Sequence, residues 1–291
     1  MKPAPFEYHV PGAVTDAVSL LTELGDEAKV LAGGQSLVPM LALRLTAYPH
    51  LVDITRIAEL KGIEIRDGAL WIGAGTAEAA VERSDEVARS VPLLAKATPF
   101  IGHFQIRNRG TVGGSIAHAD PAAEYPAVVL ALDASMEVVS ASGRRTIAAA
   151  DFFDGMWATA LGPDELLAGT MFPIWTGRTG FGVEELARRH GDFAVAGAAL
   201  GLELDGEDRV RRCAIGLFGL GSTPERARVA EAHVLGSPVD DLDPEEIGHL
   251  AVAGLGSVPD DLHGSAEYRR RVGAVMVSRA WSAAREEARG G

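Results

Sequence analysis

The hydrophobic positions near the start of the chain recur every three to four residues, a spacing that predicts a helix with one buried face. This face comprises Val14, Ala17, Val18, Leu21 and Leu24. Thr15 is a suitable N-cap for the helix, and Gly25 is a suitable end. Apolar runs then predict strands at residues 29–32 and 51–54, with a short helix at 38–45 between them. The pattern therefore predicts a small α/β unit.

From about residue 58 onward, shorter apolar runs separated by turn residues predict a second sub-unit that is richer in strands. The dipeptide Asp67-Gly68 is a hairpin signal within it. We expect helices at residues 87–97 and 126–132, and Pro126 suits the first turn of the latter. Further strands are expected at residues 135–140, 145–147 and 165–175.

Residues 175–180, Trp-Thr-Gly-Arg-Thr-Gly, have the composition of a linker, so we expect a domain boundary there. The first domain would span residues 1–176, with sub-units at about 1–57 and 58–176, and the second would span 177–291. The second domain is predicted to contain an antiparallel sheet, with strands at 193–204 and 210–220, followed by helices at 224–235, 244–255 and 266–288. The last helix would bury Val272, Val275, Met276, Ala280 and Ala283. The predicted fold class is α+β.

The charge balance limits the partners of this protein. With 27 basic and 40 acidic side chains, the formal net charge is −13, which argues against nucleic acid as a partner. No run approaches the roughly 20 apolar residues that span a bilayer, and the N-terminus lacks the apolar core of a signal peptide. We therefore expect a cytoplasmic protein without a membrane span. Because Cys213 is the one cysteine, this chain cannot supply the thiolates of an iron–sulfur cluster.

Two glycine loops carry the chemistry that the sequence reveals. The first glycine loop, residues 32–36, reads Ala-Gly-Gly-Gln-Ser and directly follows an apolar run. The second glycine loop, residues 109–115, contains Gly113 and Gly114 between the hydroxyls of Thr111 and Ser115. Glycines allow a close backbone approach with N–H groups that point outward, as a pyrophosphate requires. We expect the two loops to hold one dinucleotide from two sides.

Other candidate motifs are weaker. Residues 73–78 approximate a dinucleotide-binding fingerprint, but Glu78 stands where that motif needs a small residue. His118, Asp120 and Glu124 resemble a metal site, yet no second cluster of ligands supports them, so we expect no metal. Glu124 is better placed to accept hydrogen bonds from ribose hydroxyls. No acid–base or nucleophilic machinery is evident, and we therefore name no catalytic residue; this pattern fits a protein whose chemistry is carried by a flavin.

Taken together, these motifs resemble the flavin-binding medium subunit of molybdenum hydroxylases, the group that contains carbon monoxide dehydrogenase and the flavin domain of xanthine dehydrogenase. The resemblance runs over nearly the whole chain. It is carried by residues 32–44, 51–54, 106–115, 120–124, 188–193 and 221–227.

The resemblance implies a non-covalently bound FAD in a two-sub-unit domain of the vanillyl-alcohol oxidase type, followed by a small C-terminal domain of the CO dehydrogenase flavoprotein type. The implied FAD contacts in the two loops are Leu31, Ala32, Gly33, Gly34, Gln35, Ser36 and Leu37, with Thr111, Val112, Gly113, Gly114 and Ser115. Glu124 would lie near the adenosine half, and Ile101 and Leu167 would be backbone or apolar contacts.

The resemblance also implies partner subunits. A large subunit would carry molybdopterin, a small subunit would carry two 2Fe–2S clusters, and the assembly would be a dimer of heterotrimers. Electrons would pass from the clusters to FAD on this chain and then to an external acceptor. One alternative is a self-sufficient oxidase of the vanillyl-alcohol oxidase type, although Gln35 occupies the slot where many of those enzymes carry a flavin-linking histidine. Another alternative is a flavin-free scaffold module.

Overall fold

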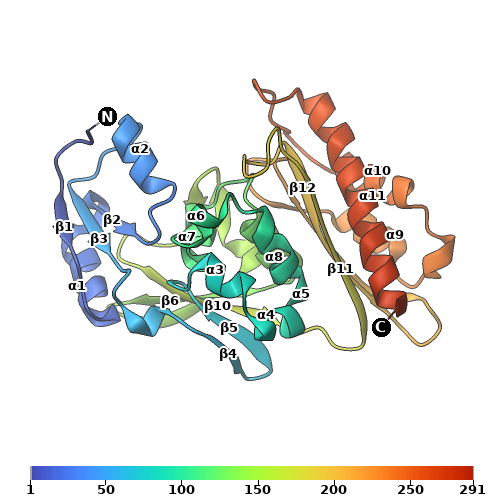
Figure 1. The fold of residues 1–291 in the computed structure, drawn as a ribbon, viewed down its shortest axis with the longest axis horizontal. Coiled ribbons are helices and arrows are strands. Elements are labelled where there is room, and N and C mark those ends of the chain that lie inside the picture. The colour runs from blue at the N-terminus through green and yellow to red at the C-terminus, as the bar shows by residue number, and fades with distance from the viewer. Residues whose placement is uncertain (1, 291) are drawn as a thin grey trace.

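A small parallel sheet forms the N-terminal end of the computed structural model, which describes residues 2–290 (Figure 1). Its strands are β1 (Glu7–His9), β2 (Ala28–Leu31) and β3 (His50–Asp53), in the order β1-β3-β2. Helix α1 (Val14–Leu24) covers one face, and its buried residues share a core with Val52. Thr15 is not the N-cap that we expected, because the helix already begins at Val14. Gly25 ends α1 with a φ of +51°.

The second sub-unit is built on an antiparallel sheet of order β4-β5-β10-β6-β7. Its strands are β4 (Ile63–Arg66), β5 (Ala69–Gly73), β6 (Ser135–Ser140), β7 (Gly143–Ala148) and β10 (Leu166–Pro173), and a separate ribbon comprises β8 (Phe153–Gly155) and β9 (Ala158–Thr159). The predicted hairpin is present, with Asp67 and Gly68 both at positive φ between β4 and β5. Short helix α2 (Leu37–Leu43) precedes this sub-unit and lies beside the N-terminal sheet.

Six short helices pack on the second sub-unit: α3 (Glu78–Glu82), α4 (Asp85–Ser90), α5 (Pro92–Ala97), α6 (Phe104–Arg107), α7 (Val112–His118) and α8 (Glu124–Ala131). The single helix expected at residues 87–97 is two helices, because Pro92 has no N–H and Val91 leaves the helical region at φ −138° and ψ 67°. Helix α8 begins at Glu124, two residues before the expected start, and every one of its residues is buried.

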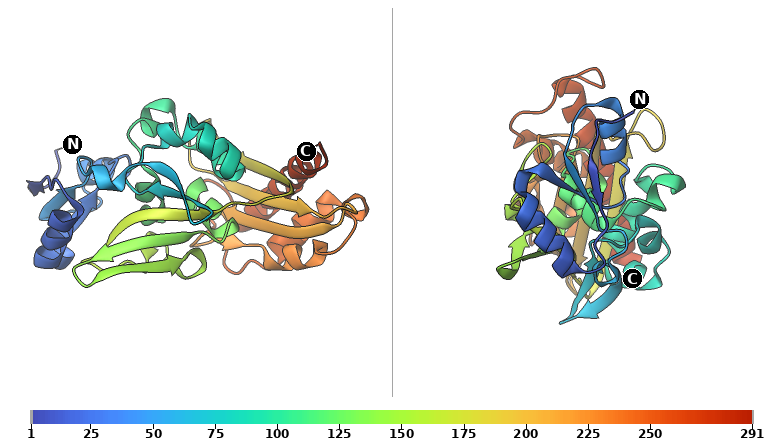
Figure 2. Two further views of the ribbon diagram at one scale, coloured as in Figure 1. Left: turned by 90° about the horizontal axis from the view of Figure 1, so that it is seen from below. Right: turned by 90° about the vertical axis from the view of Figure 1, so that its left-hand side faces the viewer.

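The C-terminal sheet is antiparallel, in the order β11-β12-β13-β14, and lies between helices on both faces (Figures 1 and 2). Its strands are β11 (Arg178–Leu186), β12 (Ala196–Leu204), β13 (Val210–Phe218) and β14 (Glu225–Arg226). Helix α8 packs closely on one face, where a Cβ on Gly216 would lie 2.3 Å from the Ala127 carbonyl oxygen. Part of the expected linker is therefore strand, since β11 already begins at Arg178.

Helices α9 (Arg228–Val234), α10 (Pro244–Ala253) and α11 (Ala266–Gly290) complete the C-terminal part. Asp243 caps α10 by accepting a hydrogen bond from the Glu245 N–H. The predicted face of α11 is partly wrong, because Val275 and Ala283 are exposed. The buried face is turned toward Ala274, Val277, Trp281 and Ala284. None of the helices within residues 2–290 combines the length and the apolar character needed to cross a membrane.

Candidate functional site

The two glycine loops meet where the N-terminal sheet adjoins the second sub-unit. A Cβ on Gly33 would lie 2.2 Å from the Arg109 carbonyl oxygen, and a Cβ on Gly114 would lie 3.4 Å from the Ala32 Cβ. The first loop leaves the end of β2, and the second leads into α7. The fold therefore brings together two loops that are about 80 residues apart in the sequence.

The first glycine loop presents unpaired backbone donors. Within residues 2–290, the N–H groups of residues 33–36 have no protein hydrogen-bond acceptor. Gly34 adopts a φ of +73°, which a residue with a Cβ rarely takes, and the Gln35 side chain donates to the Gly33 carbonyl at 3.0 Å. A row of free N–H groups at the end of a strand is a suitable cradle for an anion.

The second glycine loop is built differently from our expectation. Its N–H groups do not point outward: Val112 donates to the Thr76 carbonyl at 3.0 Å and Gly113 to the Ala74 carbonyl at 2.9 Å. Gly114 donates to the Thr111 hydroxyl at 3.1 Å, so Thr111 caps α7. A Cβ on Gly113 would lie 2.3 Å from the Ala74 Cβ. These glycines therefore let α7 pack tightly behind the first loop.

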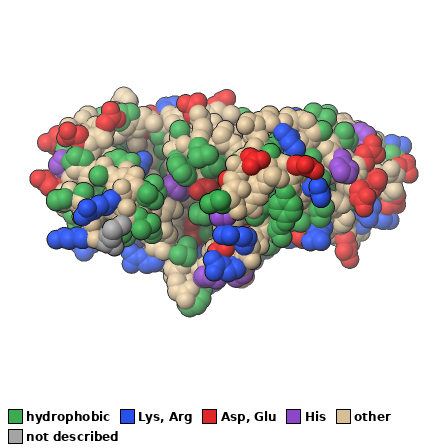
Figure 3. All heavy atoms as spheres, turned by 90° about the horizontal axis from the view of Figure 1, so that it is seen from above, with side chains coloured by type: hydrophobic (Ala, Val, Ile, Leu, Met, Phe, Trp, Pro, Cys, Tyr) green, Lys and Arg blue, Asp and Glu red, His purple; other side chains and the backbone are tan. Residues whose placement is uncertain are grey.

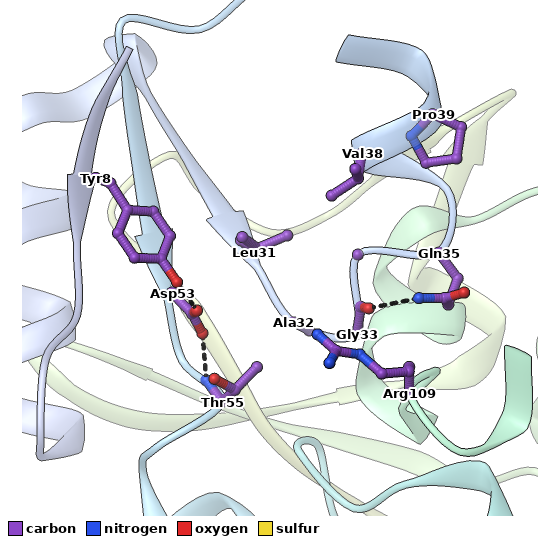
Figure 4. A pocket seen from close by; sticks show the side chains of 11 residues that line it. Tyr8, Leu31, Ala32, Gly33, Gln35, Val38, Pro39, Asp53, Thr55 and Arg109 are labelled. Atoms are coloured by element: carbon purple, nitrogen blue, oxygen red, sulfur yellow. Dashed lines mark hydrogen bonds between the residues drawn. The ribbon is translucent and has the colours of Figure 1, made fainter. Parts of the chain in front are cut away.

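A cavity of about 350 Å³ opens beside the first loop (Figure 4). Its lining comprises Tyr8, Leu31, Ala32, Gly33, Gly34, Gln35, Val38, Pro39, Asp53, Thr55 and Arg109. The hydroxyl of Tyr8 donates to Asp53, which also accepts the Thr55 N–H at 2.8 Å. The cavity thus combines apolar walls, free N–H groups and a cation, the features of a site for a phosphate-bearing ligand with flat rings.

The hydrogen bonds of Asp53 set its ionisation and that of Tyr8. Burial alone would raise the pKa of Asp53, but the hydrogen bonds from Thr55 and Tyr8 outweigh it and lower that pKa. The bond to Asp53 raises the pKa of Tyr8. Asp53 is therefore a fixed anion that orients the Tyr8 ring at the cavity wall.

Sequence reasoning found only part of this lining. It named residues 31–35 but not Tyr8, Asp53 or Arg109, and Ser36 and Leu37 lie outside the lining. Two signals were available: Asp53 ends an apolar strand, and Arg109 is the first residue of the second glycine loop. Tyr8 gave no signal, since it lies in a polar segment and reaches the site only through strand pairing.

Glu124 lies at the start of α8, and its electrostatic neighbours include two further carboxyls, the buried Glu78 and the partly buried Glu185. Burial, and next the charge of Glu185, raises the pKa of Glu124 to about 8. Burial also raises the pKa of Glu78 to about 8 and that of Glu185 to about 7. One oxygen each of Glu78 and Glu185 is buried without a hydrogen-bond partner within residues 2–290. We call Glu78, Glu124 and Glu185 the carboxyl cluster; at neutral pH these groups can donate as well as accept hydrogen bonds.

The remaining predicted contacts lie apart from the cavity. Ile101 and Leu167 are buried in the core of the second sub-unit, and neither lines the 350 Å³ cavity. The Ile101 carbonyl accepts a hydrogen bond from Arg107 at 3.1 Å. Asp120 accepts hydrogen bonds from the Ala122 N–H and the Trp157 indole, and His118, Asp120 and Glu124 do not bring their ligand atoms together as one group within residues 2–290.

Two facing glycine loops, free backbone donors and an apolar cavity on an α+β scaffold define a protein that binds a dinucleotide. A comparison with known families agrees with this class: residues 4–175 match the FAD binding domain in molybdopterin dehydrogenase, and residues 182–284 match the CO dehydrogenase flavoprotein C-terminal domain.

Full-length relatives extend the agreement. The chain is 41% identical over 289 residues to the 6-hydroxypseudooxynicotine dehydrogenase complex subunit alpha of Paenarthrobacter nicotinovorans, covering 99% of this chain and 97% of that protein. It is 38% identical to the carbon monoxide dehydrogenase medium chain of Hydrogenophaga pseudoflava, covering 98% of each. A solved structure of carbon monoxide dehydrogenase from Hydrogenophaga pseudoflava superposes with a TM-score of 0.95 at 40% identity, covering 99% of each chain.

The chain therefore belongs to the molybdenum hydroxylase flavoproteins and is a medium, FAD-binding subunit of that family. The predicted fold, a two-sub-unit FAD-binding domain followed by an antiparallel sheet with helices, is confirmed. These comparisons also confirm the family that the sequence motifs predicted.

Proposed function

We propose that this chain is the electron-transfer subunit of a molybdenum hydroxylase complex and that it holds FAD non-covalently at the two glycine loops. The observation that carries the proposal is the first glycine loop: within residues 2–290 the N–H groups of residues 33–35 have no protein acceptor, and the same residues line the cavity together with Arg109. Unpaired N–H donors and a nearby cation suit the two negative charges of a pyrophosphate. The rings and the ribose of a dinucleotide carry no such charge and would not need them.

Each part of the site has a role in this proposal. The first loop binds the pyrophosphate through its free N–H groups, the flanking residues Leu31 and Leu37 complete the predicted contacts, and Arg109 neutralises the pyrophosphate. The second loop, Thr111 to Ser115, contributes hydroxyls and supports the first loop from behind through Gly113 and Gly114. Glu124 hydrogen-bonds the adenosine half, while Ile101 and Leu167 remain predicted apolar or backbone contacts.

Bound FAD would supply the redox chemistry that the side chains of this chain lack. Residues of the chain bind and orient the cofactor and exclude water from it. In the assembled complex, two 2Fe–2S clusters on a small partner subunit would supply the electrons, molybdopterin on a large subunit would be the site of substrate oxidation, and an external acceptor would receive the electrons. We further propose that the assembly is a cytoplasmic dimer of heterotrimers and that the domain boundary lies near residue 176.

Cofactor binding is tested first with an absorption spectrum of the purified chain, repeated on the supernatant after acid precipitation. We expect a flavin spectrum that moves into the supernatant. A matched pair of variants then tests the site: Arg109→Ala should weaken FAD binding about tenfold, whereas Arg144→Ala, an exposed arginine on β7, should not. Covalent flavin in the pellet, or equal affinity in both variants, would contradict the proposed site.

Electron transfer is tested by co-expression with the large and small subunits of the same organism. We expect a complex that co-purifies, in which reduction of the clusters is followed by bleaching of the flavin absorbance in stopped-flow measurements. A folded, flavin-loaded chain that binds neither subunit would overturn the assignment. Rapid oxidation of small alcohols by the isolated chain would instead favour a self-sufficient oxidase.

A further inference from the structure

Three side chains of metal-ligating type meet at the edge of the N-terminal sheet, away from the two loops. Glu7 and His9 lie on the edge strand β1, and His50 lies on the central strand β3. The parallel register pairs Glu7 with His50 and His9 with Val52. Side chains alternate along a strand, so Glu7 and His9 share one face while Tyr8, between them, lies on the other.

The distances among these side chains match those between the ligands of one metal ion. His9 Nε2 lies 3.2 Å from His50 Nδ1, and His50 Nδ1 lies 3.6 Å from Glu7 Oε2. All three ligand atoms lie within 4.8 Å of one another. A tetrahedral zinc ion with bonds of about 2.0–2.1 Å separates its ligands by roughly 3.3 Å. Two of the three separations are therefore already close to the required value.

Small rotations close the third separation. The Glu7 side chain is 74% exposed and free to turn, whereas the His50 side chain is 17% exposed and is fixed on the central strand. The two imidazole rings are tilted by 43°, with centroids 5.3 Å apart, so their nitrogens converge without stacking. This geometry leaves a fourth position toward solvent for water.

The ligand set selects the type of metal. Two imidazole nitrogens and one carboxylate oxygen are typical of zinc and of later first-row transition metals, while calcium and magnesium prefer oxygen ligands alone. We propose that Glu7, His9 and His50 form a site for a divalent transition metal ion, with Zn²⁺ as the probe.

The bound ion would tie the N-terminal strand to the sheet. Strand β1 has three residues, and among the strands of residues 2–290 its one partner is β3. A metal joining His9 to His50 adds a link between these strands, and it also holds Tyr8, whose ring lines the cavity on the opposite face. The site therefore stabilises one wall of that cavity.

Isothermal titration of the tag-free, EDTA-treated full-length chain with Zn²⁺ tests the proposal. We expect one tight site per chain and a higher thermal unfolding midpoint with Zn²⁺ than with EDTA. His9→Gln and His50→Gln should each lower the affinity at least a hundredfold, and Glu7→Gln about tenfold. The matched control is His103→Gln, since His103 also lies beside a second imidazole, that of His190, with ring centroids 5.6 Å apart.

A second measurement guards against variants that fold poorly. Cobalt(II) bound to the wild-type chain should give the visible absorption of a four-coordinate site with nitrogen and oxygen ligands, and Zn²⁺ should displace it. The proposal is overturned if wild type binds neither ion at micromolar concentrations. It is equally overturned if folded His9→Gln and His50→Gln bind Zn²⁺ as wild type does, because the two histidines then form only a hydrogen-bonded pair.

Discussion

Gly33 and Arg109 are in such close backbone contact that a methyl group on Gly33 would stand 2.2 Å from the Arg109 carbonyl oxygen. The contact joins the first glycine loop of the N-terminal sub-unit to the second glycine loop of the next sub-unit. A real Cβ never comes so near an oxygen, so only glycine at position 33 permits this arrangement.

Gly33→Ala should therefore separate the two loops. We expect FAD affinity to fall at least tenfold, measured by titration of flavin fluorescence, while far-ultraviolet circular dichroism shows an unchanged fold. The matched control is Gly256→Ala, because no heavy atom of the described part of the chain lies within 4 Å of a Cβ built there. Equal affinity of Gly33→Ala and wild type would show that the loop contact does not shape the cofactor site.

The carboxyl cluster predicts how stability depends on pH. Burial raises the pKa of Glu124 from its ordinary value near 4.5 to about 8, so between these values the folded chain holds a proton that the unfolded chain has lost. The stabilisation is complete below about pH 4.5 and is lost as pH rises toward 8. Glu124→Gln removes this dependence. Between pH 5 and pH 8, the free energy of unfolding of the flavin-free wild type should therefore fall by on the order of 2 kcal/mol more than that of the flavin-free variant.

Urea unfolding of wild type and Glu124→Gln at both pH values checks this prediction. The control is Glu23→Gln, which changes an exposed carboxylate on α1. If Glu124→Gln and wild type lose stability in parallel as the pH rises, Glu124 is ionised in the folded chain and the cluster does not hold its proton.

Arg107 anchors the loop that precedes α6. Its guanidinium bonds both oxygens of Glu82 at 2.9 Å and the carbonyls of Ile101 and Gly102 at 3.1 and 3.2 Å. Arg107→Met leaves the buried Ile101 carbonyl and the partly buried Gly102 carbonyl without this donor, removes the pair with the partly exposed Glu82, and should lower the free energy of unfolding by about 2 kcal/mol. Arg89→Met is the control: its pair with Glu86 is solvent-exposed, so the loss should stay within about 0.5 kcal/mol. Similar losses in urea unfolding would contradict an anchoring role.

The contact between β11 and α11 depends on small residues. A Cβ on Gly180 would lie 1.9 Å from the Ala284 carbonyl oxygen and 2.6 Å from the Ala288 nitrogen. Gly180→Ala must push α11 away from the sheet, and we expect a thermal unfolding midpoint lower by roughly 5 °C. Gly206→Ala, in the open turn between β12 and β13, should leave the midpoint unchanged. If Gly180→Ala had the same unfolding midpoint as wild type, α11 could move away from the sheet without loss of stability, and the close contact would not be required.

The distribution of charge is visible on the molecular surface. Acidic and basic side chains are interspersed over the face drawn in Figure 3. The formal net charge of −13 is summed over the whole sequence and is not read from this one face. The overall charge is a property of composition alone, so the sequence was sufficient to predict it.

Local patterns predicted most elements, and the failures have specific physical causes. Strand β1 was not predicted because its three residues are polar and are held only by pairing with β3. Helix α7 was read as a loop because of its two glycines, yet hydrogen bonds to Ala74 and Thr76 fix its first turn. The start of strand β11 was predicted to be a linker because it is rich in glycine. The structure shows that Gly180 and Gly182 allow the α11 backbone to pack closely against the strand.

The sequence by itself determined the first glycine loop, the position of the second glycine pair, the Asp67-Gly68 hairpin, the α+β class and the family, because each depends on residues adjacent in the chain or on long runs of matching motif. The tertiary structure decided which loop keeps its N–H groups free, since the partners of the second loop, Ala74 and Thr76, come from a different segment. It also assembled the carboxyl cluster and the ligands Glu7, His9 and His50. Burial and distance set the chemistry of these groups, and both arise only when remote segments pack together.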